Sequence, residues 1–359
     1  MKNSVRILIA ILLLTACSNP DKSTHAEKAI GERWSIDQVK EWSARHEWIR
    51  GSNFQPSTAI NQLEMFQSET FDPETIDREL GWAEEIGMNA MRVYLHHAAW
   101  GADPEGFKSR LDQFLSIAHR HNIKIMFVFF DDCWNAEYSV GKQPEPKPGK
   151  HNSGWVQDPG TYIHKDPSLI FALEKYVKDV MTSFKTDERV MLWDLYNEPG
   201  NNGWGNQSMN LLQKVFEWGR QVNPTQPLTA GVWNYSLSDL NKFQTENSDI
   251  ITYHNYNAME NHQAAIDTLL AYGRPLICSE YMARKHGSTF QGVMPELKKQ
   301  NIGAINWGFV SGKTNTIYAW DTPVPDGSEP ELWFHDIFRK DGSAYRAEEV
   351  ELIRKLTGK

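Results

Sequence analysis

Apolar and polar positions alternate in blocks along this chain, from about Trp48 to its end. Short, nearly continuous apolar runs are separated by longer segments in which apolar residues recur every three or four positions. The first pattern is typical of strands covered on both faces, and the second of amphipathic helices. The apolar runs occupy residues 48–54, 89–95, 124–130, 190–196, 227–233, 250–256, 275–281 and 303–309.

The intervening segments carry helix signals. Asp72 and Pro73 fit an N-cap and a first helical position, Ile76 and Leu80 follow at helical spacing, and Gly87 ends the segment. Eight β/α units in about 260 residues match the size of a (β/α)8 barrel. We therefore predict an α/β fold, a single (β/α)8 TIM barrel built from residues 34–359. The other helical patterns occupy residues 105–121, 167–184, 209–222, 262–271, 290–300 and 347–356, with a short, weak one at 237–243.

The first residues have the features of an export signal. Two basic residues precede an apolar stretch, residues 7–14, that is too short to span a bilayer. The stretch ends in Leu14-Thr15-Ala16-Cys17, which resembles a bacterial lipobox. The resemblance implies a signal peptide of residues 1–16, lipidation of Cys17 and an exported, membrane-anchored lipoprotein, periplasmic or at the cell surface. A plain secretory signal is the alternative, and the polar residues 17–33 are expected to form a tether.

Composition and charge narrow the possible partners. The chain has 37 basic and 46 acidic side chains, a net charge of −9, and no block of basic residues. Nucleic acid is therefore not an expected partner, because phosphate binding needs clustered Lys and Arg. Cys133 follows predicted strand three and Cys278 lies in predicted strand seven, and these two strands face each other across a barrel. That separation is too large for a disulfide, so we expect two buried free thiols.

Two predicted connections are long, and both leave the C-terminal ends of strands. One covers residues 131–166 after strand three, and the other covers residues 310–333 after strand eight. Barrel active sites are built at this end, and loops of such length are usually functional or disordered. The Pro-rich stretch 143–149 in the first loop is either mobile or, with Trp134 and Trp155 on its two sides, part of a structured wall.

Two glutamates stand where predicted strands end. Glu198 follows the apolar run of strand four, and Glu280 lies near the end of strand seven. Rigid strands would hold both carboxylates at the same end of the barrel. A pair of carboxylates is the equipment that most glycosidases use to cleave a glycosidic bond.

Five motifs together resemble clan A of the glycoside hydrolases, and most closely family 5. They cover the whole barrel, about residues 34–356, in the order in which the clan carries them along its strands. The chain departs from family 5 at the end of strand three, where many members have a histidine and this sequence has Phe129-Phe130-Asp131-Asp132. The motifs are Arg92 in Met91-Arg92-Val93, Asn197-Glu198-Pro199, His254-Asn255-Tyr256, Glu280 and Trp307.

The resemblance implies a retaining glycosidase that cleaves a poly- or oligosaccharide through a glycosyl-enzyme. Glu280 would be the nucleophile, kept ionised by Arg92 and the Tyr256 hydroxyl. Glu198 would be the acid/base. It must begin protonated, so we expect a less polar setting or the nearby charge of Glu280 to raise its pKa.

The remaining candidates would bind or orient the sugar. Asn197 would bond the 2-hydroxyl, and His254 would bond a sugar hydroxyl or orient Glu198. Trp307 would form an aromatic floor, and Trp134 with the pair Trp233-Asn234 are the preferred further contacts, because an indole offers a broad apolar surface. Four other tryptophans near strand ends are weaker candidates, of which about half are expected to pack under loops: Trp100, Trp155, Trp204 and Trp320.

Other readings stay open at this point. A sugar-binding surface lipoprotein with a catalytically silent barrel, or a transglycosylase, would use the same fold. A metal reading of His96-His97 or Asp131-Asp132 is not favoured, because neighbouring residues in a strand point to opposite faces. We expect no cofactor and no metal.

Overall fold

The computed structural model describes residues 31–359, apart from the side chains of Tyr162, Leu169 and Ala172. Eight parallel strands form one sheet in the order β5-β4-β3-β2-β1-β8-β7-β6. A parallel bridge between Val232 and Tyr253 joins β5 to β6 and closes the ring. The prediction of a (β/α)8 barrel is therefore confirmed. The strands are β1 (Arg50–Asn53), β2 (Ala90–Tyr94), β3 (Lys124–Asp131), β4 (Val190–Asn197), β5 (Leu228–Thr229), β6 (Ile251–His254), β7 (Leu276–Glu280) and β8 (Gly303–Asn306).

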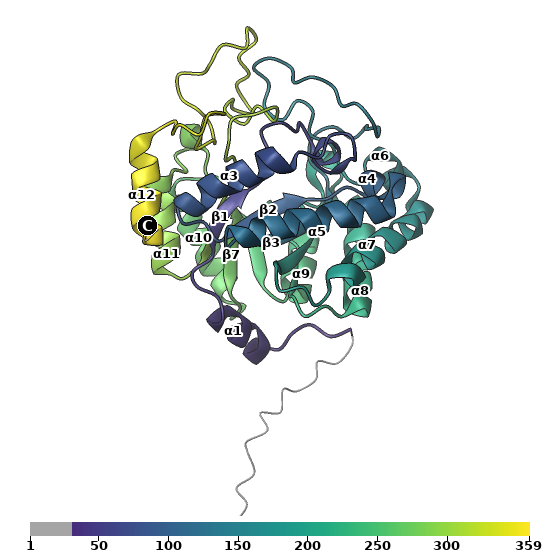
Figure 1. Cartoon of the computed structure of the whole chain (residues 1–359). Coiled ribbons are helices and arrows are strands. Elements are labelled where there is room, and N and C mark those ends of the chain that lie inside the picture. The colour runs from purple at the N-terminus through teal and green to yellow at the C-terminus, as the bar shows by residue number, and fades with distance from the viewer. Residues whose placement is uncertain (1–30) are drawn as a thin grey trace, which may run out of the picture.

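Helices cover the outside of the ring (Figure 1). Helix α3 starts as its sequence indicates, since the Asp72 side chain accepts a hydrogen bond from the Thr75 backbone and Pro73 is the first helical residue. The helix predicted at 237–243 is longer than expected, and α1, α2, α4 and α6 were not predicted. The α-helices are α1 (Ile36–Ala44), α2 (Gln62–Phe66), α3 (Pro73–Glu85), α4 (His97–Ala102), α5 (Pro104–Arg120), α6 (Thr161–Lys165), α7 (Ile170–Phe184), α8 (Met209–Val222), α9 (Ser238–Asn247), α10 (Met259–Leu270), α11 (Phe290–Lys299) and α12 (Ala347–Thr357).

Helix α1 packs against the barrel at the end where the strands begin (Figure 1). Trp34 and Trp42 are buried in an apolar cluster with strand residues such as Met126. Arg33 donates hydrogen bonds to the backbone carbonyls of Thr245 and Ser248. The barrel domain therefore includes Arg33, which the sequence had assigned to the tether. The predicted signal peptide, Cys17 and most of the tether lie outside the described residues.

The opposite end carries the two long loops, residues 132–160 after β3 and the segment from residue 307 onward after β8 (Figure 1). Their backbones pair directly, since the Val324 N–H donates to the Gly149 carbonyl over 2.9 Å. Gly149 has a φ of +65°, and a Cβ atom there would lie 1.5 Å from the Val324 carbonyl oxygen. Only glycine fits this close approach, so the Pro-rich stretch belongs to a structured wall.

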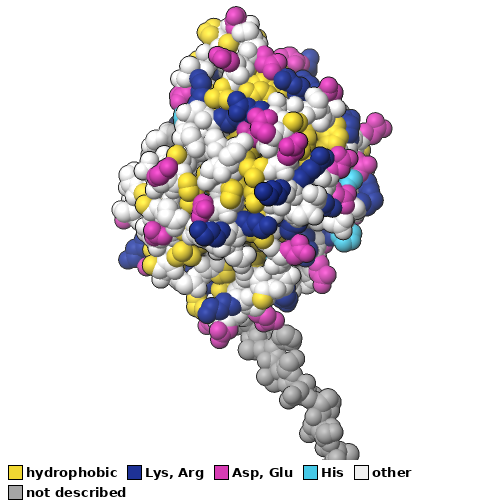
Figure 2. Space-filling view, turned by 90° about the vertical axis from the view of Figure 1, so that its left-hand side faces the viewer, with side chains coloured by type: hydrophobic (Ala, Val, Ile, Leu, Met, Phe, Trp, Pro, Cys, Tyr) yellow, Lys and Arg dark blue, Asp and Glu magenta, His cyan; other side chains and the backbone are white. Residues whose placement is uncertain are grey.

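The surface shows no separation of charge on the face drawn in Figure 2, where acidic and basic side chains are interspersed. Cys133 and Cys278 are buried and unbridged, as expected. Within residues 31–359, no helix combines the length and apolarity that crossing a bilayer requires.

Candidate active site

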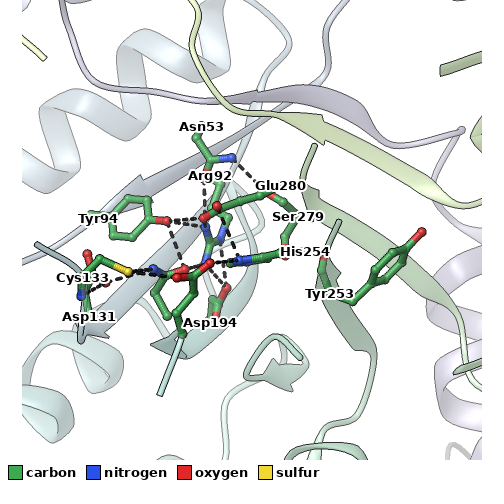
Figure 3. A network of polar contacts seen from close by, with 12 residues as sticks. Asn53, Arg92, Tyr94, Asp131, Cys133, Asp194, Tyr253, His254, Ser279 and Glu280 are labelled. Carbon is green, nitrogen blue, oxygen red and sulfur yellow. Dashed lines mark hydrogen bonds and ion pairs between the residues drawn. The ribbon is translucent and has the colours of Figure 1, made fainter. Parts of the chain in front are cut away.

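A buried arginine ties together the ends of four strands (Figure 3). Arg92 on β2 is fully buried and pairs with Asp194 on β4, at 2.8 Å. Its guanidinium also donates to Glu280 on β7 over 2.8 Å and to Asn197 over 2.7 Å. The Asn53 side chain on β1 accepts a further bond. Removing one partner of such a buried pair typically costs about 3–5 kcal/mol, so Arg92 fixes the geometry of the site as well as its charge.

Glu280 is the last residue of β7, and hydroxyl and guanidinium groups surround its carboxylate. It accepts hydrogen bonds from Arg92, from the Tyr94 hydroxyl over 2.8 Å and from the Tyr256 hydroxyl over 2.6 Å. The predicted partners Arg92 and Tyr256 are therefore both brought to it. Tyr94 was missed, although it lies two residues after Arg92 on the same strand and so on the same face.

Glu198 lies in the turn directly after β4, with a φ of +46°. One carboxylate oxygen accepts a bond from His254 Nδ1 over 2.8 Å. The other accepts from the Cys133 thiol over 3.1 Å and from the Asn201 amide over 2.5 Å. Of the two roles proposed for His254, the structure shows the contact with Glu198.

The pKa of Glu198 differs from the expectation. Burial favours the neutral acid, but hydrogen bonds and charge from His254, and bonds from Cys133 and Asn201, outweigh burial and hold the pKa of the Glu198 carboxyl below its ordinary value. The expectation of a raised pKa is therefore wrong. Burial raises the pKa of the Cys133 thiol, which remains a neutral S–H donor.

Asp131 is the last residue of β3. It accepts bonds from the Asn197 amide over 2.9 Å and from the Trp155 indole over 2.7 Å. Burial raises its pKa to about 7. Both polar ends of the Asn197 side chain are thus engaged by the protein, its oxygen by Arg92 and one N–H by Asp131. The Asn197 amide also donates to the Cys133 sulfur over 3.5 Å.

These groups line a cavity of about 400 Å³. Trp134, Trp233 and Trp307 border it, as do Trp155 and Trp320. The predicted contact Asn234 does not line this cavity, because its side-chain oxygen accepts bonds from the backbone N–H and hydroxyl of Ser236. Trp100 and Trp204 also lie elsewhere; the first donates to Asp179, and the second stacks on His164.

Two clusters in the described residues have the composition of a metal site. One is Glu198, His254 and Glu280 themselves, with ligand atoms within 4.8 Å of one another. The other is His96, His97 and Asp158. The prediction that the two histidines point to opposite faces is wrong, because β2 ends at Tyr94 and the His96 side chain caps α4.

The histidine cluster is satisfied by protein groups. His96 Nδ1 accepts from the Ala98 backbone and its Nε2 donates to the Gln157 carbonyl. Burial lowers the pKa of His96 to about 4, so the ring is neutral. Because both ring nitrogens are hydrogen-bonded, His96 offers no free ligand atom. Its two hydrogen bonds connect α4 to the loop after β3.

Comparison with known proteins identifies the family of this chain. The family model described as Cellulase (glycosyl hydrolase family 5) matches residues 55–312. Comparison with curated protein sequences gives no match.

Several solved structures share the fold. A GH5_18 protein from Streptomyces cattleya, solved with GlcNAc, has a TM-score of 0.60 and 11% identity over 86% of this chain and 79% of its own. The endo-1,4-beta-D-mannanase of Thermotoga petrophila RKU-1 has a TM-score of 0.57 and 17% identity over 87% and 99%. The beta-mannanase of the blue mussel Mytilus edulis has a TM-score of 0.53 and 15% identity over 88% and 92%.

Proposed function

Because this chain belongs to glycosyl hydrolase family 5 and is a glycosidase, we propose that it cleaves β-linked sugars with retention of configuration. One observation carries the proposal: carboxylate oxygens of Glu198 and Glu280 lie within 4.8 Å of each other. Retaining enzymes hold their carboxyl groups about 5–5.5 Å apart, whereas inverting enzymes need about 6.5–9.5 Å to admit a water.

In the first step, Glu280 attacks the anomeric carbon while the bond from that carbon to the leaving oxygen breaks. Arg92, Tyr94 and Tyr256 orient the attacking carboxylate. Glu198 gives a proton to the leaving oxygen. Since the free site favours its charged form, Glu198 takes up that proton when a bound sugar displaces water and strengthens the burial effect.

In the second step, Glu198 acts as a base. It removes a proton from a water molecule, whose oxygen attacks the anomeric carbon and releases Glu280. His254 Nδ1 lies 2.8 Å from Glu198 and 3.4 Å from Glu280. It therefore positions both carboxylates through one ring.

β-1,4-linked mannosides are our first substrate class, since mannanases are among the proteins of the same fold. A barrel that only binds sugar would not need a carboxylate pair with two separate sets of donors, so we favour catalysis over binding. Transfer to a sugar acceptor in place of water uses the same residues, and product analysis at high acceptor concentration separates the two.

The lipobox supports a further proposal about location. We propose that the mature chain is anchored to a membrane by lipid on Cys17 and that residues 18–32 carry the barrel away from it. The test is metabolic labelling with a fatty acid. Label should enter the wild type and be lost in Cys17→Ala.

The test of the mechanism is the stereochemistry of the first product. Proton NMR during hydrolysis of an aryl β-glycoside should show the β-anomer first, followed by mutarotation. Early appearance of the α-anomer would exclude double displacement.

A further inference from the structure

The two long loops close one side of the cavity. Besides the pair formed by Val324 and Gly149, the Asn152 N–H donates to the Thr314 carbonyl over 2.9 Å. The Asn315 amide donates to the carbonyls of Lys147 and Lys150. We call residues 147–152 and 314–324 the joined loops.

The joined loops pack against the segment that follows β1. Lys313 donates from its backbone to the Ser57 carbonyl and pairs with Glu64 at 2.6 Å. Asn61 reaches across to Gln143 in the loop after β3. In the sheet, β1 and β2 lie between β8 and β3. The joined loops and the segment after β1 therefore form a continuous wall over the side of the barrel that runs from β8 to β3.

Among residues 31–359, no such wall stands on the other side of the cavity. The connections after β5 and β6 are short, residues 230–237 and 255–258. The cavity lining there consists of Trp233 with Asn201 and Asn202 from the turn that follows Glu198. A leaving group must lie beside Glu198 to receive its proton, so it departs over this open side.

The walled side holds the sugar that is attacked. Trp155 and Trp307 pack with Tyr94, a donor to Glu280, in one aromatic cluster on this side. Trp320 from the joined loops lies against Tyr256, with ring centroids 4.9 Å apart. The joined loops therefore close the cavity on the far side of the sugar that becomes bonded to Glu280, and we call this the closed end of the cavity.

His151 presents an acceptor at this closed end. Its ring lines the cavity between Trp134 and Trp320, at centroid distances of 5.3 and 5.9 Å. Nδ1 lies 2.9 Å from the Tyr318 carbonyl, which can only accept, so Nδ1 carries the proton. Burial lowers the pKa of His151 to about 4 and keeps the ring neutral. Nε2 is then a bare acceptor, and no group among residues 31–359 bonds to it.

From the wall and its acceptor we propose that this enzyme releases single sugars from the non-reducing ends of β-linked chains, with His151 accepting a hydrogen bond from a hydroxyl of the terminal unit. A further sugar on that unit would meet the joined loops. Each turnover breaks one glycosidic carbon–oxygen bond and consumes one water. The inference rests on the proposed function, which it sharpens from glycosidase to exo-glycosidase.

The test uses the purified protein and β-1,4-linked tetrasaccharides of mannose, glucose and xylose, each labelled at the reducing end. At low conversion the labelled product should be the trisaccharide alone. Early labelled disaccharide would show internal cleavage, and early labelled monosaccharide would show release from the other end. Either pattern overturns the exo inference while the proposed hydrolysis stands. If no tetrasaccharide or aryl β-glycoside is cleaved, the proposed function itself fails.

Two glycines of one loop provide a matched pair of variants. Gly149→Ala puts a methyl group against the Val324 carbonyl and should separate the joined loops, so labelled disaccharide appears early. Gly141→Ala has a similar positive φ, +96°, with nothing within 4 Å of the added carbon, and should keep the wild-type pattern. If Gly149→Ala loosens the loops, as shown by faster proteolysis there, and still gives trisaccharide alone, the wall does not decide the product.

His151→Asn tests the acceptor. Its amide can replace Nδ1–H toward Tyr318, but it does not reach the position of Nε2. Loss of one neutral hydrogen bond should raise KM about two- to tenfold with little change in kcat. An unchanged KM would overturn the role of His151 in recognising the terminal sugar.

Discussion

The end of β7 and the turn after β4 each present one glutamate to the same cavity, in opposite kinds of surroundings. Glu280 belongs to a strand, and it accepts hydrogen bonds from a buried guanidinium and two phenol hydroxyls. Glu198 lies outside the strand with a positive φ, and its donors are a histidine, a thiol and an amide.

The difference matches two chemical tasks. A nucleophile needs a fixed position and a lasting charge, which strand geometry and Arg92 provide. An acid/base must gain and lose a proton during each turnover, so it suits a site without the fixed guanidinium charge that Glu280 accepts. The pair therefore divides the work by environment, although both residues are glutamates.

A third glutamate, away from the site, shows what burial does without such donors. Glu79 on α3 is buried, and the Ser57 backbone N–H is its bonded donor. Burial raises the pKa of Glu79 to about 7. The pKa of Glu198 is lowered instead, because hydrogen bonds and charge from His254, and hydrogen bonds from Cys133 and Asn201, outweigh its burial. The donors, and not the depth of burial, set the direction for Glu198.

The largest effect should come from removing the fixed carboxylate. We expect Glu280→Gln to lower kcat by about 10⁴-fold or more on every substrate, because the amide is a far weaker nucleophile than the carboxylate that forms the glycosyl-enzyme. Steady-state kinetics measures the loss, and thermal unfolding checks that the variant is folded. A folded variant with substantial activity would show that Glu280 is not the nucleophile.

Replacing the other carboxylate should give a loss that depends on the leaving group. For Glu198→Gln we expect roughly a 10²–10⁴-fold fall with an oligosaccharide, since its departing oxygen needs a proton. An aryl glycoside with an acidic phenol needs none in the first step and should react in a fast initial burst. Equal loss in the first step for both substrates would contradict proton donation by Glu198.

The thiol beside Glu198 should tune its proton affinity. Cys133→Ala removes a donor that lowers the pKa of Glu198, so the basic limb of kcat/KM against pH should move to higher pH. The rate near neutral pH should change by no more than about tenfold. Cys133→Ser keeps a hydroxyl donor and should keep the wild-type limb. Identical pH profiles for the alanine and serine variants would show that the hydrogen bond from Cys133 does not lower the pKa of Glu198.

The smallest effect should be seen in stability alone, at Glu79. Its pKa in the fold, about 7, lies above the ordinary 4.5. The stability that the neutral form provides is therefore complete below about pH 4.5 and is lost as pH rises through 7. Glu79→Gln should lessen that loss, by up to about 3 kcal/mol between pH 5 and 8.5, with unchanged activity. Urea unfolding at both pH values tests this, and parallel losses in wild type and variant would contradict it.

Much of the site could be predicted because strand ends converge in a barrel. The apolar runs fixed where β2, β4 and β7 end, and with them Arg92, Glu198 and Glu280 at one rim. Tyr94 could have been found by the same rule. Asn234 was placed wrongly because a turn, which the pattern does not resolve, bonds its side chain to Ser236.

The sequence by itself determined the barrel, its strand order and the two carboxylates, because these follow from periodicity within short segments. Only the tertiary structure decided the state of Glu198, the place of Cys133 beside it and the wall that carries His151. His151 meets the Tyr318 carbonyl across 167 positions of sequence. Such contacts use backbone groups that every residue possesses, so no pattern of residues predicts them. They form only when both loops have folded against each other.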